Sequence, residues 1–115
     1  MKEIILEKSP DNLNGLLKDQ VLEEIKIKLK DRVIHAYVYG SFLTKDFSRE
    51  SDIDLIIIKN VKTPFVERGF EFFDLRDWLP AIEILVYTPA EFESLTKNPS
   101  AGFWQSVVSS MRRII

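Results

Sequence analysis

The sequence predicts an α/β (α+β) fold in which helices flank a mixed sheet of three or slightly more strands. Short segments rich in β-branched and aromatic residues, near 33–39, 52–58 and 81–87, alternate with longer segments in which apolar residues recur at helical spacing. The chain has 115 residues, of which 45% are hydrophobic, and it lacks internal repeats and low-complexity tracts. We therefore expect one single domain over residues 1–115.

The composition argues against several classes of protein. The chain has no cysteine, so it contains neither a disulfide framework nor a thiolate zinc site. Its N-terminal segment is too short and too acidic for a signal peptide, and no apolar run approaches membrane-spanning length, so we expect a cytoplasmic protein with no membrane partner. A formal net charge of −2 and a pI near 5.4 do not support nucleic-acid binding, although a local basic patch could still provide it.

The N-terminal third of the chain predicts a helix followed by a strand. Apolar residues recur at helical spacing from roughly Asp11 to Lys30, with charged residues between them, and Asp11 or Asn12 can cap this helix. The segment 33–39 is β-branched and aromatic, and Gly40 stops it. We therefore expect a strand that ends in a tight turn at Gly40.

The rest of the chain predicts two more strands and three more helices. Residues 52–58 are apolar throughout their end, as in a strand buried on both faces at the centre of a sheet. Thr88, Pro89 and Glu91 form the pattern of a helix cap. The expected elements are a strand at 52–58, a helix opened by Thr63 and Pro64 that runs to Trp78, a strand at 81–87, a short helix after Thr88 and a final helix over 103–115.

The residues that can carry chemistry lie at a turn and at the start of a strand. Gly40 and Ser41 close the first strand, and Asp52 and Asp54 open the second after ten intervening residues. Residues two apart on a strand point to one face with Cα atoms about 6.6 Å apart, so both carboxylates can converge on one or two cations. On an apolar strand two such carboxylates repel each other and lose solvation unless a cation or solvent neutralises them.

The turn and the carboxylates must share one end of the sheet if they are to act together. This requires antiparallel first and second strands if the two are neighbours, and a third strand parallel to the second, because a helix connects those two. Glu83, near the start of the third strand, then falls at the same end as Asp52 and Asp54. We therefore expect three carboxylates to meet beside Gly40 and Ser41.

These residues resemble the signature of the DNA polymerase beta-like nucleotidyltransferase superfamily, in which Gly-Ser is followed by a spacer and by Asp-x-Asp between hydrophobic residues. The resemblance is specific over positions 38–58 and extends to the strand that contains Glu83. The chain looks most like the minimal nucleotidyltransferases. This branch has only the core domain and is often paired with a helical partner of the HEPN type in toxin–antitoxin modules.

The resemblance implies a fold, an activity and a role for each residue. It implies the nucleotidyltransferase fold and metal-dependent transfer of a nucleoside monophosphate, which we expect to be AMP, from an NTP such as ATP to an acceptor such as a HEPN-type partner protein. It implies that Gly40 and Ser41 bind the triphosphate and that Asp52 and Asp54 are ligands of two Mg²⁺ or Mn²⁺ ions. Glu83, where the family commonly has Asp, is implied as metal ligand or base.

Several residues have competing interpretations. Lys45 and Arg49 in the spacer could add positive charge at the triphosphate, or they could simply be solvated. Glu83 could be an exposed carboxylate on an edge strand. We expect His35, the only histidine of the chain, to be structural, and Ser41 lacks a second histidine that could activate it as a nucleophile.

The aromatic and C-terminal segments also have two interpretations each. We expect one aromatic set to pack in the core rather than stack a base: Phe65, Phe70, Phe72, Phe73 and Trp78. The apolar face of residues 103–115 is expected to be core, with part of it available as an interface for a partner or a homo-oligomer. Two functions other than catalysis stay open. One is a non-catalytic antitoxin that binds a helical partner, and the other is a regulatory domain that holds NTP without turnover.

Overall fold

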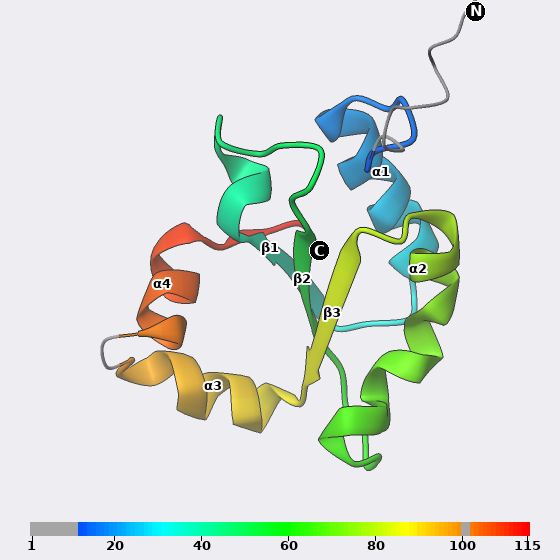
Figure 1. The fold of residues 1–115 in the computed structure, drawn as a ribbon. Coiled ribbons are helices and arrows are strands. Elements are labelled where there is room, and N and C mark those ends of the chain that lie inside the picture. Colours follow the sequence, from blue (N-terminus) through cyan, green and yellow to red (C-terminus); the bar gives the residue numbers. More distant parts are fainter. Residues whose placement is uncertain (1–11, 100–101) are drawn as a thin grey trace, which may run out of the picture.

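A four-stranded mixed sheet with helices on both faces forms the centre of the computed structural model, which describes residues 12–99 and 102–115 (Figure 1). The predicted fold class is therefore confirmed. The strands are β1 (His35–Tyr39), β2 (Ile53–Ile58), β3 (Ile82–Tyr87) and β4 (Arg112–Arg113). The α-helices are α1 (Lys18–Leu29), α2 (Phe73–Trp78), α3 (Pro89–Lys97) and α4 (Phe103–Ser110), and the 3-10 helices are η2 (Gly40–Leu43) and η3 (Phe65–Phe72).

The strand order is β3-β2-β1-β4, and the strand directions agree with those predicted. β1 and β2 are antiparallel, with Tyr39 opposite Asp54. β2 and β3 are parallel, with Asp54 opposite Glu83, and η3 and α2 form the crossover between them. Because β2 has a neighbour on each side, it lies inside the sheet, which explains its continuous apolar sequence.

The side chains of β2 alternate between two apolar layers. Ile53, Leu55 and Ile57 pack with buried residues of α1, η3 and α2. Ile56 and Ile58 pack on the opposite face with residues of α3 and α4. The even-numbered residues of β2 therefore face the side of the sheet on which α3 and α4 lie.

The first helix is shorter than the sequence predicts. α1 begins at Lys18, whereas the prediction placed the start near Asp11, a residue outside the described part of the chain. Asn12, the other predicted cap, lies in a turn at residues 12–15 and does not cap α1. Asn14 and Gly15 have φ angles of +53° and +79°. These left-handed residues interrupt the helical path, so the apolar periodicity extends further than the helix itself.

The aromatic segment before β3 is not one continuous helix. It consists of the 3-10 helix η3 followed by α2, and the tighter turn of a 3-10 helix changes which side chains share a face. Phe72 is fully buried and Trp78 is partly buried, as predicted. Phe65, Phe70 and Phe73 are instead 44%, 65% and 54% exposed, so the core assignment of these three rings was wrong.

The final predicted helix ends early and is followed by a fourth strand. α4 stops at Ser110, Met111 is extended, and residues 112–113 pair with β1 as β4. The N–H of Ile114 donates to the carbonyl of Ala36 at 2.8 Å. The open edge of β1 offers backbone hydrogen-bond partners that residues 112–115 could not use if they continued the helix. The apolar pattern of the sequence does not show that these residues can pair with a strand instead.

The cap of α3 agrees with the prediction from its sequence. The N–H of Glu91 donates to Oγ1 of Thr88 at 3.2 Å, and the N–H of Thr88 donates to Oε1 of Glu91 at 2.9 Å. Pro89 occupies the first position of this helix. In the two described ranges, no helix has both the length and the apolar character needed to cross a membrane.

Candidate active site

The turn that ends β1 lies directly against the carboxylate of Asp54. Gly40 has a φ of +80°, and a Cβ atom built on it would lie 2.9 Å from Oδ2 of Asp54. Any other residue at this position would strain the backbone and collide with the carboxylate, so glycine is what allows the close approach. The structure therefore brings the predicted turn and the start of β2 together.

Glu83 lies at the same end of the sheet and on the same face as Asp54. The two residues are register partners, and both alternate with apolar residues that belong to the core layer of α1. The carboxylate of Glu83 pairs with Arg76 of α2, with 3.5 Å between Oε2 and Nη2. In residues 12–99 and 102–115, no three acidic or histidine side chains lie close enough to form a ready-made metal cluster. The carboxylates of Asp52, Asp54 and Glu83 thus lie at the same end of the sheet, but they do not form a ready-made metal site.

The charges of the three carboxylates nevertheless act on one another. Burial raises the pKa of Asp54, and the negative charges of Asp52 and Glu83 raise it further. The side chain of Asp54 makes no hydrogen bond or ion pair with the described residues. Carboxylate oxygens are the ligands that Mg²⁺ and Mn²⁺ prefer, and a cation here would relieve the repulsion. Asp54, which has no side-chain partner among the described residues, suits such an ion, and Asp52 is exposed two residues away, whereas Glu83 is paired with Arg76.

Tyr39 forms one wall of this carboxylate site. Burial raises the pKa of Tyr39 to about 12, and the charges of Asp54, Tyr87 and Glu83 contribute to the shift. Its hydroxyl therefore stays protonated at neutral pH and can donate a hydrogen bond. The sequence interpretation missed Tyr39, although its position just before Gly40 and its alternation along β1 could have indicated it.

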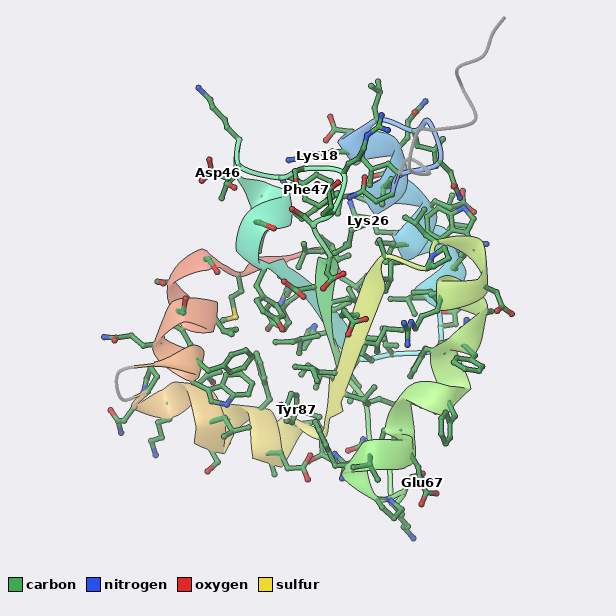
Figure 2. All side chains as sticks on the ribbon, in the orientation of Figure 1. Lys18, Lys26, Asp46, Phe47, Glu67 and Tyr87 are labelled. Atoms are coloured by element: carbon green, nitrogen blue, oxygen red, sulfur yellow. The ribbon has the colours of Figure 1, made fainter. Side chains whose placement is uncertain are left out.

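The connection between η2 and β2 is held against the N-terminal part of the chain. Nδ2 of Asn12 donates to the carbonyls of Ser48 and Ser51, at 2.7 and 2.9 Å. Nζ of Lys18 lies 4.9 Å from the ring centroid of Phe47, and Figure 2 shows the two side chains near each other above the sheet. These contacts hold residues 47–51, which precede Asp52, against the N-terminal part of the chain.

The remaining predicted residues lie at the margins of the site. Lys45 and Arg49 are exposed in the connection between η2 and β2, and their contact with a triphosphate stays a prediction. The hydroxyl of Ser41 makes no hydrogen bond within the described part of the chain. Nδ1 of His35 lies 3.2 Å from the carbonyl oxygen of Ile115, at the opposite end of β1 from the turn. This contact is consistent with a structural role for His35.

A cavity of about 220 Å³ adjoins the carboxylate site between η3, α2 and β3. Glu83 and Arg76 lie at the cavity together with the exposed rings of Phe65, Phe70 and Phe73. Four consecutive residues of β3 line it, and since successive side chains point to opposite faces, the cavity follows the free edge of that strand. It therefore lies beyond Glu83, on the side away from the Gly40 turn.

Comparison with known proteins identifies the family. The family described as polymerase beta nucleotidyltransferase matches residues 20–115. The chain therefore belongs to the polymerase beta nucleotidyltransferase family. A crystal structure of a candidate nucleotidyltransferase from Sulfolobus solfataricus is similar with a TM-score of 0.49 and 14% identity, over 77% of this chain and 84% of that one. No curated protein gives a match.

Proposed function

We propose that this chain is a metal-dependent nucleotidyltransferase that moves AMP from ATP to an acceptor on a partner protein. One observation carries the proposal: the Gly40 turn touches the carboxylate of Asp54, at the end of the sheet where Asp52 and Glu83 also lie. Backbone N–H groups in a tight turn can bind phosphate oxygens. Carboxylates beside them can hold the divalent cation that accompanies a triphosphate.

Two Mg²⁺ or Mn²⁺ ions are the proposed cofactors. Asp52 and Asp54 would hold them because both are acidic and the side chain of Asp54 has no partner among the described residues. Glu83 would complete the set by exchanging Arg76 for a cation. When bound, the ions neutralise phosphate charge and lower the pKa of the acceptor hydroxyl.

The residues of the chain position the triphosphate and remove one proton. Gly40 keeps the backbone of the turn close to the phosphates, the amide and hydroxyl of Ser41 bind phosphate oxygens, and Lys45 and Arg49 add positive charge around them. The acceptor oxygen attacks the α-phosphorus, a new P–O bond forms, and the bond from the α-phosphorus to its bridging oxygen breaks, so that pyrophosphate leaves. The carboxylate of Glu83 takes the proton of the acceptor hydroxyl.

A protein acceptor is favoured by the surface next to Glu83. Four large apolar side chains are exposed along η3 and at the start of α2: Phe65, Val66, Phe70 and Phe73. Exposed apolar patches of this kind mark contact sites for other proteins. We propose a helical HEPN-type protein as the partner, in the cytoplasm, where ATP and Mg²⁺ are available. A homo-oligomer through the same patch is the other arrangement that this surface suits.

The test is transfer of label from ATP to the protein encoded by the neighbouring gene. The wild-type chain, Mg²⁺ and ATP labelled at the α-phosphate should label that protein, while ATP labelled at the γ-phosphate should not. Asp54→Asn should abolish the α-label, whereas Asp46→Asn, which changes an exposed loop carboxylate, should retain it.

The same experiment separates the alternative functions. A non-catalytic antitoxin would bind the neighbouring protein and leave it unlabelled, with or without ATP. A regulatory NTP-binding domain would bind ATP and change its affinity for the partner without label transfer. Either result would refute the enzymatic proposal.

A further inference from the structure

Helix α4 connects the Gly40 turn to an exposed aromatic ring. At its last residue, the hydroxyl oxygen of Ser110 accepts from the N–H of Gly40 at 3.4 Å. At its first residue, the ring centroid of Phe103 lies 6.0 Å from that of Tyr39, with 88° between the ring planes. The eight residues of α4 span about 12 Å. One element therefore contacts the Gly40 turn with its last residue and carries an exposed aromatic ring on its first residue.

The ring of Phe103 is held firmly although half of it is exposed. Trp104 makes an edge contact with it at 5.3 Å and 90°, and Tyr39 contacts it from the sheet. Trp104 in turn packs at 5.3 Å from Tyr87 and at 6.2 Å from Phe92. Figure 2 shows that side chains fill this region between the sheet, α3 and α4. The side chain of Phe103 remains 51% exposed at the border of this aromatic cluster.

We propose that Phe103 is the platform on which the base of the bound nucleoside triphosphate stacks. This inference rests on the proposed function and adds a base subsite to the phosphate and metal site. A fixed, half-exposed aromatic ring suits a base because every base has a π-face, and such stacking requires no hydrogen-bond pattern. The subsite therefore accepts nucleoside triphosphates in general and favours purines, which offer the larger stacking surface.

The other exposed rings lie on the wrong side of the carboxylates for this role. Phe65, Phe70 and Phe73 belong to η3 and α2, beside the free edge of β3. Phe103 instead approaches Tyr39 on β1, which is not the edge strand β3. Figure 1 shows α4, which carries Phe103, on the other side of the sheet from α2. The two aromatic groups thus flank the site from opposite sides, and the helix that carries Phe103 contacts the Gly40 turn through Ser110.

The experiment compares binding of ATP with binding of inorganic tripolyphosphate by the full chain, both with Mn²⁺ and without acceptor. Phe103→Ala should weaken ATP binding about 5- to 30-fold and leave tripolyphosphate binding unchanged, because only ATP carries a base. Phe103→Tyr should bind ATP like the wild type, and Phe103→Leu, which keeps an apolar side chain without a ring, should behave like the alanine variant. Phe70→Ala, at a ring that is 65% exposed beside β3, should bind both ligands normally.

Tryptophan fluorescence provides a second readout. The chain has two tryptophans, so in the Trp78→Phe background the emission reports Trp104, the neighbour of Phe103. ATP should change this emission, and tripolyphosphate at saturation should not.

The possible results separate the base subsite from the proposed function. If the wild type binds ATP and tripolyphosphate and Phe103→Ala changes neither affinity, the base subsite is refuted while the phosphate site stands. An equal loss of both ligands in Phe103→Ala would also refute it, since the ring would then support the turn rather than the base. If the wild type binds neither ligand with Mn²⁺, the proposed function fails, and the base subsite fails with it.

Discussion

Neutralising Asp54 should stabilise the metal-free chain while removing its divalent-metal site. Asp54 is half-buried, and the negative charges of Asp52 and Glu83 repel its carboxylate. Its side chain has no partner among the described residues. At a separation of about 7 Å, two unit charges repel by about 0.6 kcal/mol in water and by about 1.2 kcal/mol at a dielectric constant of 40. We therefore expect Asp54→Asn to raise the free energy of unfolding by about 0.5–1.5 kcal/mol.

The assay is unfolding by urea and by heat in EDTA at pH 7, which removes stabilisation by bound metal. The expected gain corresponds to a rise in Tm of about 2–6 °C for a domain of this size. Asp52→Asn should have a smaller effect because Asp52 is exposed, and Asp46→Asn is the control with no expected change. A loss of about 1–3 kcal/mol in Asp54→Asn would show that the carboxylate supports the fold, which would refute this reasoning.

The pH dependence of the same variant follows from the direction of the pKa shift. The pKa of Asp54 in the folded chain is raised above its ordinary value of 3.8, mainly by burial. The folded state therefore binds this proton more tightly than the unfolded state, and stability falls as the pH rises from 3.8 through the folded pKa. The advantage of Asp54→Asn should be complete at neutral pH and should disappear below about pH 3.8.

Four further changes test the site and its surroundings. Gly40→Ala should cost about 1–3 kcal/mol more in urea unfolding than Gly15→Ala, because both glycines have positive φ but only a Cβ at Gly40 meets the neighbouring carboxylate; equal costs would contradict the close approach. MgATP at 100 times its Kd should stabilise the chain by about 2.7 kcal/mol in a thermal melt, and no shift at millimolar MgATP would argue against a site. Arg76→Gln should tighten Mn²⁺ binding without nucleotide by about two- to fivefold, since it frees Glu83; weaker binding in a titration would show that Arg76 supports the site instead. Val66→Asp, at a side chain that is 82% exposed, should retain ATP binding and lose label transfer to the partner, and normal transfer would exclude this surface as the docking site.

The strands of the sheet and their relative directions could be predicted from short segments of the sequence and from how these segments are connected. The alternation of β2 and its continuous apolar end indicated a central strand, and the need to bring Gly40 beside Asp54 predicted the antiparallel pairing with β1. The parallel pairing with β3 followed from the intervening crossover, which then placed Glu83 opposite Asp54. The first inference uses the apolar pattern along one strand, and the two pairings use the need for one shared site and the geometry of a helical crossover, so none of them requires knowledge of distant contacts.

The features that were not predicted depend on contacts between residues far apart in the sequence. Residues 112–113 form β4 because β1 has an open edge, and no helical periodicity shows which edge is open. Arg76 of α2 forms an ion pair with Glu83 of β3. Neither segment alone shows that an arginine lies beside this carboxylate, so the pair could not be predicted. The exposure of Phe70 and Phe73 depends on where a 3-10 helix becomes an α-helix.

The order of strand pairing has a consequence for how this chain folds. β1 and β2 are joined by the connection at residues 40–52, whereas β3 reaches β2 only after η3 and α2 have formed the crossover. Loop closure favours the more local pairing, so the hairpin of β1 and β2 should assemble early and already hold Asp52 and Asp54 side by side. Glu83 brings its negative charge to them when β3 joins. The late addition of β3 to the sheet therefore occurs against electrostatic repulsion between these carboxylates. Divalent cations reduce this repulsion, so they should raise the folding rate as well as stabilise the folded site.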